Sequence, residues 1–406
     1  MAENLEAHLF DEVYLDNPRP LYVKMRDLGR IVQSSAFPPN KYWLVTGHDE
    51  ANRIVRNHKA FGKAGYWDLM EEQLGPEGRA PIAMLRKWMS QLDPPDHTPI
   101  RSAFAATFTP RAIQDFDPII EAVVADAMTA IQGADQPVDL MPSLAYEVPI
   151  LVICEILGVR GGDRAAFKRW SSDLVRLFEP GVSADALLEC GRAVENFSAY
   201  LSDLIDDRRR APRNDITSKL VLGNPNFRTD SGRQALIANL MLLVWAGHET
   251  TMNLIGNGLL AFARNPHAVE TLVAEPDLMP NAIEEVLRYE GPIRTTSRIA
   301  HEPVVVGDMQ ISEGDMVVVL QQAANGDPLV FADGDRFDVR RENARSHLGF
   351  GGGIHFCLGA SLARAEASVV FREYFRRFGV PQVVDEKPDW NRSLFVRGLN
   401  SLRVAL

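Results

Sequence analysis

Residues 347–367, HLGFGGGIHFCLGASLARAEA, place the cysteine Cys357 in a glycine-rich stretch directly ahead of a helix-forming run. Four glycines lie between positions 349 and 353, and Gly359 follows the cysteine. Because glycine tolerates unusual backbone angles and close approach, such a loop can point several backbone N–H groups at one atom. The helix that begins beyond the cysteine also directs its positive end toward the sulfur. Both effects favour the thiolate over the thiol.

A thiolate held by N–H donors is the axial ligand that a haem iron requires, since such hydrogen bonds adjust electron donation to the metal. A buried structural cysteine in a turn is the alternative interpretation of this loop. A dinucleotide-binding fingerprint is excluded because its third glycine would fall at Phe356. A zinc site is excluded because no Cys-x-x-Cys pair accompanies the loop.

The composition predicts a folded protein with a large core, since 46% of its 406 residues are hydrophobic. The net charge of −11 argues against a nucleic-acid-binding protein, which needs a basic face. The three cysteines are too scattered for a disulfide framework and fit a reducing cytoplasm. The N-terminal residues 1–20 carry acids and no apolar core, so we expect neither a signal peptide nor a membrane anchor. We therefore expect a cytoplasmic protein.

Apolar spacing of 3.6 residues predicts helices over most of the stretch from 113 to 260, and short β-rich runs lie near both ends of the chain. The longest helical run contains polar residues such as Asn239 and Glu249, which argue against a membrane span. The expected elements are hairpins over 30–46 and 303–320, helices over 48–55, 234–264, 282–290 and 360–378, loops over 61–80 and 206–215, and strands over 394–406.

Residues 350–359, FGGGIHFCLG, resemble the haem-binding loop of the cytochrome P450 family, with Phe350, Cys357 and Gly359 at fixed positions of its motif. The resemblance implies a haem b cofactor whose iron takes Cys357 as its axial thiolate ligand. It also implies a mainly α fold with small β-sheets (α+β), in which a long central helix lies over a buried haem and the thiolate loop lies on its proximal side. Since the sequence shows no repeats and no linker, we expect a single cytochrome P450 domain over residues 1–406.

Glu285 and Arg288 resemble the family's Glu-x-x-Arg helix, in which the i, i+3 spacing puts both charges on one face. Arg336 resembles the residue that closes a network with this pair. The resemblance implies that Glu285, Arg288 and Arg336 support the fold beneath the haem. On its own, a Glu-x-x-Arg pair is common on exposed helix surfaces, where it stabilises little.

Residues 246–251, AGHETT, place an acid next to a hydroxyl on an otherwise apolar helix, which is costly to bury without a function. A zinc-protease motif is excluded because position 252 is Met. The segment is similar to the family's oxygen-binding kink, which implies that Ala246 leaves room for dioxygen, Glu249 relays protons from solvent and Thr250 assists O–O cleavage. A threonine that bonds back to its own helix is the structural alternative.

Four cationic or ionisable side chains match the family's positions for binding the two haem carboxylates. His97 and Arg101 lie one helical turn apart, and a planar guanidinium suits a carboxylate. Arg298 and His355 match two further positions. Each is an ordinary surface residue when taken alone, and the order of all four along the chain supports the resemblance.

The sequence contains no flavin or iron–sulfur domain, so the resemblance implies that electrons from NAD(P)H arrive through a ferredoxin reductase and a ferredoxin. Four arginines flank the cysteine loop and predict a basic docking patch for an acidic ferredoxin. A solvated arginine cluster is the alternative. These residues are Arg340, Arg341, Arg345 and Arg364.

The predicted substrate pocket is mostly apolar, which favours a lipophilic substrate. Arg294 is the exception, and we expect it to bind a carboxylate or a polar oxygen of the substrate. The candidate lining residues are Trp67, Met84, Trp88, Leu242, Leu243, Ile293, Arg294 and Phe395.

The resemblance implies a haem-thiolate monooxygenase that hydroxylates or epoxidises a lipophilic molecule, such as a polyketide-like or terpene-like secondary metabolite. The substrate is either free or bound to a carrier protein. Two alternatives stay open. One is a haem-thiolate enzyme that couples or rearranges its substrate without inserting oxygen. The other is a non-enzymatic haem or gas-binding protein, which has no need for Glu249 and Thr250.

Overall fold

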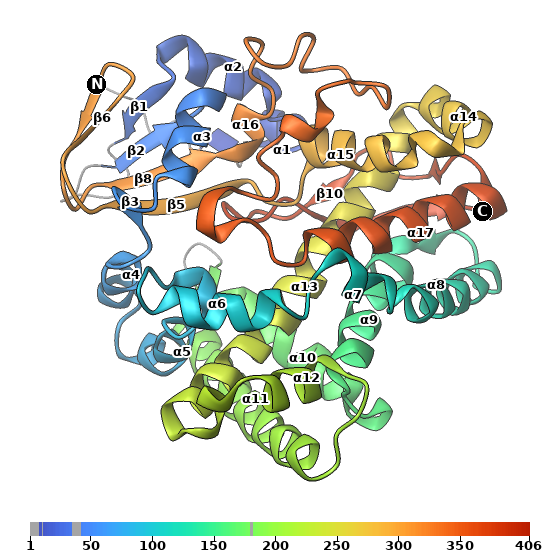
Figure 1. Ribbon diagram of the computed structural model, residues 1–406. Helices are drawn as coiled ribbons and strands as arrows, with labels where there is room; N and C mark the ends of the chain where they lie inside the picture. Colours follow the sequence, from blue (N-terminus) through green and yellow to red (C-terminus); the bar gives the residue numbers. More distant parts are fainter. Residues whose placement is uncertain (1–7, 10, 35–41, 179–181) are drawn as a thin grey trace.

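The computed structural model describes residues 8–9, 11–34, 42–178 and 182–406, and most of the described chain is helical (Figure 1). The mainly α fold with small sheets that the sequence predicts is confirmed. No described helix is both long and apolar enough to cross a membrane. The α-helices are α1 Glu12–Leu15, α2 Arg19–Leu28, α3 His48–Arg56, α4 Tyr66–Leu74, α5 Arg79–Leu85, α6 His97–Ala105, α7 Pro110–Gln114, α8 Asp117–Gln132, α9 Glu147–Leu157, α10 Arg164–Val175, α11 Ala184–Arg210, α12 Ile216–Gly223, α13 Asp230–Arg264, α14 Pro266–Ala274, α15 Met279–Glu290, α16 Gln321–Ala324 and α17 Ala360–Phe378.

A five-stranded sheet of order β1-β2-β8-β5-β3 lies at the upper left of Figure 1. β1 and β2 pair antiparallel, which confirms the first predicted hairpin, and β2 pairs in parallel with β8. The AFPPN turn of this hairpin falls in residues 35–41, outside the described residues. The strands are β1 Ile31–Ser34, β2 Tyr42–Val45, β3 Phe61–Gly62, β4 Val138–Asp139, β5 Thr295–Ala300, β6 Val304–Val306, β7 Met309–Ile311, β8 Met316–Leu320, β9 Gln382–Val383, β10 Asp389–Trp390, β11 Leu399–Ser401 and β12 Arg403–Ala405.

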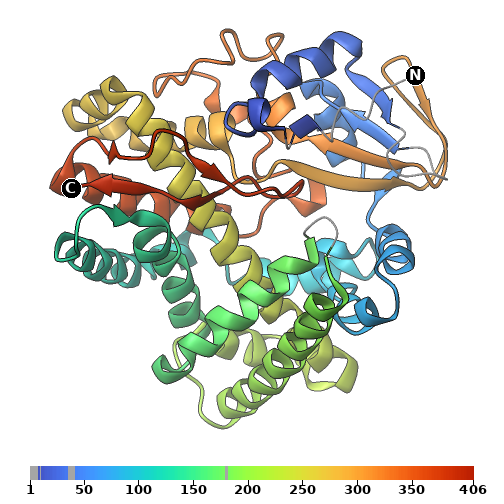
Figure 2. The same cartoon turned by 180° about the vertical axis from the view of Figure 1, so that it is seen from behind.

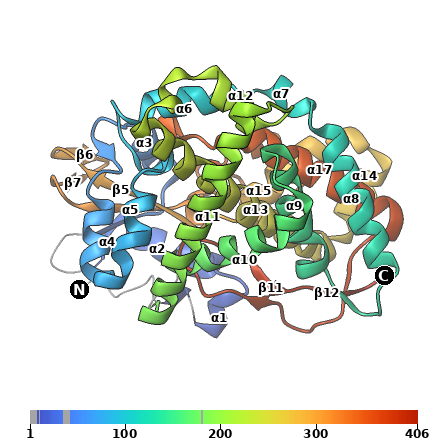
Figure 3. The ribbon, with the colours of Figure 1, turned by 90° about the horizontal axis from the view of Figure 1, so that it is seen from below.

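The long helix α13 runs through the middle of the molecule, as the views from the front and from behind show (Figures 1 and 2). Its N-cap is Thr229, whose side chain accepts a hydrogen bond from the N–H of Gly232. This cap starts the helix at Asp230, earlier than the predicted start at residue 234. The helix packs against α9, α15 and α17, and α11 crosses it in the view from below (Figure 3). Because neighbours surround it, α13 can be apolar on most of its surface without spanning a membrane.

The predicted loop over 61–80 is wrong, because this stretch contains β3, α4, a short 3-10 helix and the start of α5. Trp67 and Ile82 of these helices are buried in the main core, so burial and not local periodicity orders the segment. The predicted hairpin over 303–320 is also divided differently. β6 pairs with β7 inside the first half, whereas β8 inserts between β2 and β5 in the larger sheet.

The predicted charged loop over 206–215 is wrong in its first half, because α11 continues to Arg210. Arg208 is 1% exposed and pairs with the buried carboxylate of Asp215, so it anchors the connection to α12. At the C-terminus, β11 and β12 confirm the predicted strands only over residues 399–405. The preceding residues contribute an isolated bridge between Ile293 and Val396.

Candidate active site

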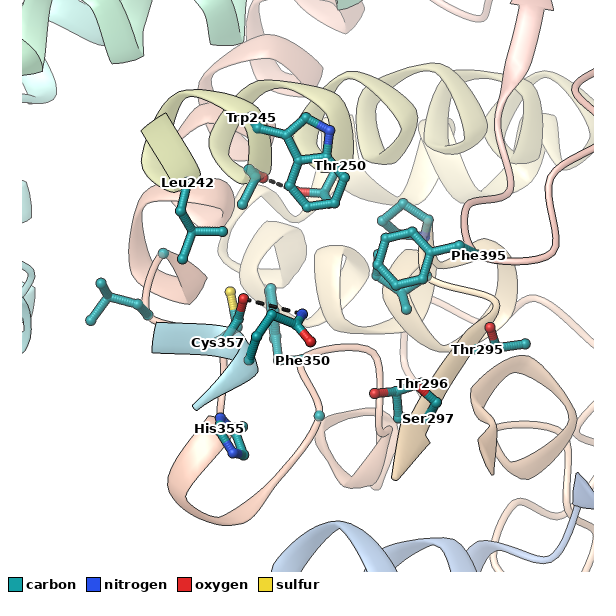
Figure 4. A pocket seen from close by; sticks show the side chains of 18 of the residues that line it. Leu242, Trp245, Thr250, Thr295, Thr296, Ser297, Phe350, His355, Cys357 and Phe395 are labelled. Atoms are coloured by element: carbon teal, nitrogen blue, oxygen red, sulfur yellow. Dashed lines mark hydrogen bonds between the residues drawn. The ribbon is translucent and has the colours of Figure 1, made fainter. Parts of the chain in front are cut away.

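A cavity of about 920 Å³ lies between the middle of α13 and the loop that carries Cys357. Figure 4 shows Thr250 and Trp245 on the helix side, Cys357 and Phe350 on the loop side, and Thr295, Thr296 and Ser297 of β5 along a third side. Its walls come from segments far apart in the sequence, from Tyr42 in β2 to Phe395 near the C-terminus. The tertiary fold therefore assembles the cavity.

The loop around Cys357 is held in a tight path by its own backbone. The Cys357 N–H donates to the Phe350 carbonyl oxygen at 2.9 Å. Gly353 has a φ of +64°, and a Cβ there would lie 2.7 Å from the Val55 carbonyl oxygen of α3. Glycine is therefore required at this position by both backbone angle and space.

The sulfur of Cys357 lies in the cavity wall, and its electrostatic surroundings are mixed. Burial raises the pKa of the Cys357 thiol above its ordinary value, while the Gly359 N–H and the guanidinium groups of Arg101 and Arg364 act in the opposite direction. The predicted N–H donor is therefore present, but burial outweighs it. A positive charge inside the cavity, such as a metal ion bound to the sulfur, would favour the thiolate.

The AGHETT segment meets the cavity through Ala246, Gly247, Thr250 and Thr251. The Thr250 hydroxyl donates to the Ala246 carbonyl oxygen at 2.7 Å, so in this structure it bonds back to its own helix. Glu249 is not among the cavity-lining residues, and its side chain is 13% exposed. The Glu249 carboxyl group and the Thr250 hydroxyl are therefore neighbours in sequence, but only Thr250 belongs to the cavity wall.

Asn253 and His248 flank the carboxylate of Glu249. The Asn253 side-chain amide donates to the Glu249 backbone oxygen at 2.9 Å and to its Oε1 at 3.4 Å. His248 Nε2 lies 3.7 Å from Glu249 Oε2. Burial lowers the pKa of His248 to about 4, so this imidazole is neutral near pH 7.

The predicted carboxylate-binding residues gather at one side of the cavity. Arg101, Arg298 and His355 line it, and the ring of His97 lies edge-on to that of His355 at 4.7 Å between centroids. The Nε2 atoms of both histidines are buried and have no hydrogen-bond partner among the described residues. Burial lowers the pKa of both imidazoles, that of His355 to about 4.

A haem fits these residues on three observations. The cavity wall contains the Cys357 sulfur, and Arg101 and Arg298 line the same space. The buried Nε2 atoms of His97 and His355 make no hydrogen bond with the described residues. A flat cofactor with one metal and two carboxylates would meet a sulfur ligand, cations and hydrogen-bond donors together. Phe350 and Gly359 complete the wall beside the cysteine.

The apolar wall is partly as the sequence predicts. Trp67, Leu242, Leu243, Ile293 and Phe395 line the cavity. Met84 and Trp88 do not, and this prediction is wrong because Trp88 lies behind Trp245, with ring centroids 5.3 Å apart. Trp245, which the sequence analysis missed, lines the cavity and stacks on Phe395 at 6.1 Å.

Arg294 is the main correction in the substrate wall, because it does not line the cavity while Ile293 and Thr295 do. Its guanidinium instead lies near Tyr22 of α2, which does not line the cavity. Arg294 is 1% exposed, and burial lowers the pKa of its guanidinium, with Tyr22 and Glu290 among the groups that act on it. The predicted contact between Arg294 and a bound substrate is therefore wrong.

The sequence analysis missed two ionisable residues of the cavity, Lys63 and Glu366. Lys63 lies between glycine and alanine in FGKAG, and nothing in that pattern marks it as buried. Glu366 lines the cavity from α17, and burial raises the pKa of its carboxyl group to about 8. Its i, i+4 spacing with Leu362 and Val370 on a helix was a signal that could have shown it to be buried.

The fold-supporting network contains Arg341 where the sequence analysis expected Arg336. Both nitrogens of the Arg288 fork donate to Glu285 at 2.7 Å, inside the core. The side chain of Arg336 is exposed, and only its carbonyl oxygen accepts from Arg288. Arg341 Nε donates to Glu285 Oε1 at 3.2 Å, because the chain turns back after Asp338.

The predicted basic docking patch is not present as a free surface. Arg341 is buried against Glu285, Arg340 pairs with Glu275, and Arg364 pairs with Glu284. Arg345 is exposed. Three of the four arginines therefore pair with acids of the same chain, but Arg340 is still 52% exposed, so docking of a ferredoxin on this face stays a prediction.

Comparisons with known proteins agree with this geometry. The cytochrome P450 family model matches residues 80–401. The chain is 36% identical to the cytochrome P450 monooxygenase PikC of Streptomyces venezuelae, over 98% of this chain and 94% of that protein. It is 35% identical to the vitamin D(3) 25-hydroxylase of Pseudonocardia autotrophica, over 99% of this chain and 97% of that protein. A solved structure of P450BioI with an acyl carrier protein ligated to hexadec-9Z-enoic acid matches with a TM-score of 0.87 and 30% identity, over 98% of this chain and all of that one.

Proposed function

Because this chain belongs to the cytochrome P450 family and is a monooxygenase, we propose that it inserts one oxygen atom from O2 into a lipophilic small molecule. The observation that carries the proposal is the cavity between Cys357 and the Ala246–Thr250 stretch of α13. Residues from β2 to the C-terminal segment line this cavity, which supports a single catalytic unit over residues 1–406.

Haem is the cofactor of this family, and its iron would supply the redox chemistry that activates O2. Cys357 would hold the iron through its sulfur, with Phe350 and Gly359 shaping the loop around it. The groups that bind its carboxylates are His97, Arg101, Arg298 and His355. The protein's contribution is to orient the cofactor and set the polarity around it.

Thr250 and Glu249 handle protons in the proposed mechanism. Thr250 lines the cavity and its hydroxyl donates to the Ala246 carbonyl, so a rotation about its χ1 would turn the hydroxyl into the cavity. Glu249 is the preceding residue and its side chain is 13% exposed, so it can exchange protons with solvent. Ala246 and Gly247 keep this part of the wall free of bulky side chains.

The substrate is proposed to be a lipophilic secondary metabolite or a fatty-acyl chain. Aromatic and aliphatic side chains such as Trp67, Leu242, Trp245 and Phe395 dominate the wall above the sulfur. One relative acts on vitamin D(3), and one structural neighbour holds a fatty acid on a carrier protein, so both free and carrier-bound substrates belong to the proposal. Electrons are proposed to come from NAD(P)H through a ferredoxin reductase and a ferredoxin.

The test is reconstitution of the purified protein with haem, a ferredoxin system, NADPH and isotopically labelled O2. The reduced protein with carbon monoxide should show the Soret band of a thiolate-bound haem, and Cys357→Ser should abolish that band. A panel of lipophilic compounds should yield a product that is heavier by one labelled oxygen atom. A product formed without added oxygen would overturn the proposal in favour of coupling or rearrangement.

A further inference from the structure

Lys63 is a buried lysine in the wall of the cavity that the proposed function does not use. It follows β3, is 9% exposed, and shares the wall with Arg101 and Arg298. These three are the only lysine and arginine side chains among the described lining residues. Within the part of the chain that the structure describes, Glu366 supplies the one carboxyl group lining the same space, and burial raises its pKa to about 8, so it carries little negative charge near pH 7.

Lys63 and Arg298 converge on one carbonyl group. Lys63 Nζ donates to the Ser297 backbone oxygen at 2.9 Å, and Arg298 Nη1 donates to the same oxygen at 2.8 Å. An ammonium group has three N–H donors, and the Ser297 oxygen is its one hydrogen-bond acceptor among the described residues. Burial, reinforced by the neighbouring Arg298 guanidinium, lowers the pKa of Lys63 well below its ordinary value. Without an anion beside it the buried ammonium is therefore disfavoured, whereas an anionic ligand in the cavity would favour it.

Among the described residues, Asp93 is the one carboxylate that acts on both Lys63 and Arg298. Its oxygens accept the backbone N–H groups of Lys63 and Ala64 at 2.8 Å, and its side chain lies 3.9 Å from His355 Nε2. A buried ammonium group beside a guanidinium is costly, so it either loses its proton or meets a further negative charge. A carboxylate ligand in the cavity would supply that charge.

We propose that Lys63 acts with Arg298 as a carboxylate-binding residue of this cavity, and that a haem propionate is its ligand. The inference rests on the proposed function. When Lys63 is protonated, Lys63, Arg101 and Arg298 together with Asp93 carry a net charge of +2 beside the cavity, which the two propionates of a haem would balance. A carboxylated substrate offers the same chemistry, and the experiment separates the two sources.

The variants are Lys63→Met, which keeps the apolar stem and removes the charge, and Lys63→Arg, which restores a cation. Lys59→Met is the matched control, because Lys59 lies four positions earlier in the chain and is exposed. Haem release to excess apomyoglobin is measured for each holoenzyme, and Soret titrations are run with fatty acids and with their methyl esters. Circular dichroism checks that each variant is folded.

Lys63→Met should release haem about tenfold faster than the wild type, the cost of one lost charged hydrogen bond, while Lys63→Arg and Lys59→Met stay within about twofold. Reconstitution with haem dimethyl ester should remove the difference between Lys63→Met and the wild type. If haem release is unchanged but free acids alone bind more weakly to Lys63→Met, Lys63 still binds a carboxylate and the substrate is its source.

Unchanged haem release together with unchanged acid binding in Lys63→Met would overturn the inference. A wild-type protein that lacks a thiolate-type Soret band would instead overturn the proposed function, so the two failures are distinct. The release assay does not depend on turnover, and the result is readable without knowledge of the native substrate.

Discussion

At the scale of single residues, the hydroxyl of Thr250 is the polar group of α13 whose removal should affect chemistry and leave structure unchanged. It donates only within its own helix turn, to Ala246, and Asn253 holds the adjacent Glu249 separately. Thr250→Ala should therefore keep haem content and substrate-induced Soret shifts. Product formed per NADPH consumed should fall by about tenfold, with hydrogen peroxide replacing it, because a positioned proton donor is lost. Parallel assays of NADPH, peroxide and product measure this.

Thr250→Ser is the control for that experiment, since it keeps the hydroxyl and removes only a methyl group. Its ratio of product to NADPH should return close to the wild-type ratio. Equal uncoupling in the serine and alanine variants would contradict a role for the hydroxyl and point to the methyl group as a packing element.

Arg340 and Arg341 are adjacent in sequence, but their side chains lie in different surroundings. Arg341 donates to buried Glu285 and to the carbonyl oxygens of Ala332 and Asp333, whereas Arg340 pairs with Glu275 at the exposed surface. Arg341→Ala should lower the free energy of unfolding by about 1.5–3 kcal/mol, because the buried Glu285 carboxylate loses one of its two guanidinium partners. Arg340→Ala should leave it unchanged within error. Urea denaturation of both holoenzymes measures the two free energies of unfolding. Equal values for the two variants would contradict a stabilising contact between Arg341 and Glu285.

At the scale of elements, close packing of α13 on α17 limits which residues the long helix tolerates. A Cβ on Gly258 would collide with the ring of Phe371 in α17 and contact Val286 of α15. Alanine is the better helix former by about 1 kcal/mol, yet Gly258→Ala should lower the free energy of unfolding, because the aromatic ring lies in a packed core.

Gly191 in α11 is the matched control, because a Cβ there meets no atom within 4 Å. Gly191→Ala should raise the free energy of unfolding by about 0.5–1 kcal/mol through helix propensity alone. Thermal unfolding of both variants beside the wild type measures the contrast. Equal shifts in the same direction would show that α13 and α17 are further apart than described.

At the scale of the whole molecule, Glu290 joins the two ends of the described chain. Arg19 and Arg397 each donate to its carboxylate at 2.9 Å, and Arg397 also donates to backbone oxygens of Leu15 and Asp16. Burial alone would raise the pKa of Glu290, but the two guanidinium groups lower it to about 2. Ends that are remote in sequence are therefore coupled by one buried carboxylate.

This coupling predicts acid lability. The pKa of Glu290 is lower in the folded state than in the unfolded state, so stability is full above about pH 4.5 and is lost as the pH falls toward 2. The loss between pH 7 and pH 3 should be about 2 kcal/mol for this group. Glu290→Gln should be less stable at pH 7 and lose less on acidification. Urea denaturation at both pH values tests this, and identical pH dependence would contradict the assignment.

The sequence by itself determined the family, the cysteine loop and the long central helix. These are local features, since a glycine-rich turn, a cysteine and the start of α17 follow one another within residues 347–367, and helical periodicity extends over α13. Cations such as Arg101 and Arg298 were identifiable because they stand at fixed positions in motifs. Local signals of this kind survive in the sequence without knowledge of distant contacts.

Only the tertiary structure decided which neighbours of those motifs face the cavity. Arg294 and Arg336 carry the charge that the predictions required, but the Arg294 guanidinium lies near Tyr22 and the Arg336 side chain is exposed. Arg341 lies where Arg336 was expected. Lys63 became visible only when β3 paired with β5 and brought it to Ser297. The direction and the burial of a side chain depend on contacts between residues far apart in sequence, and no local sequence pattern encodes these contacts.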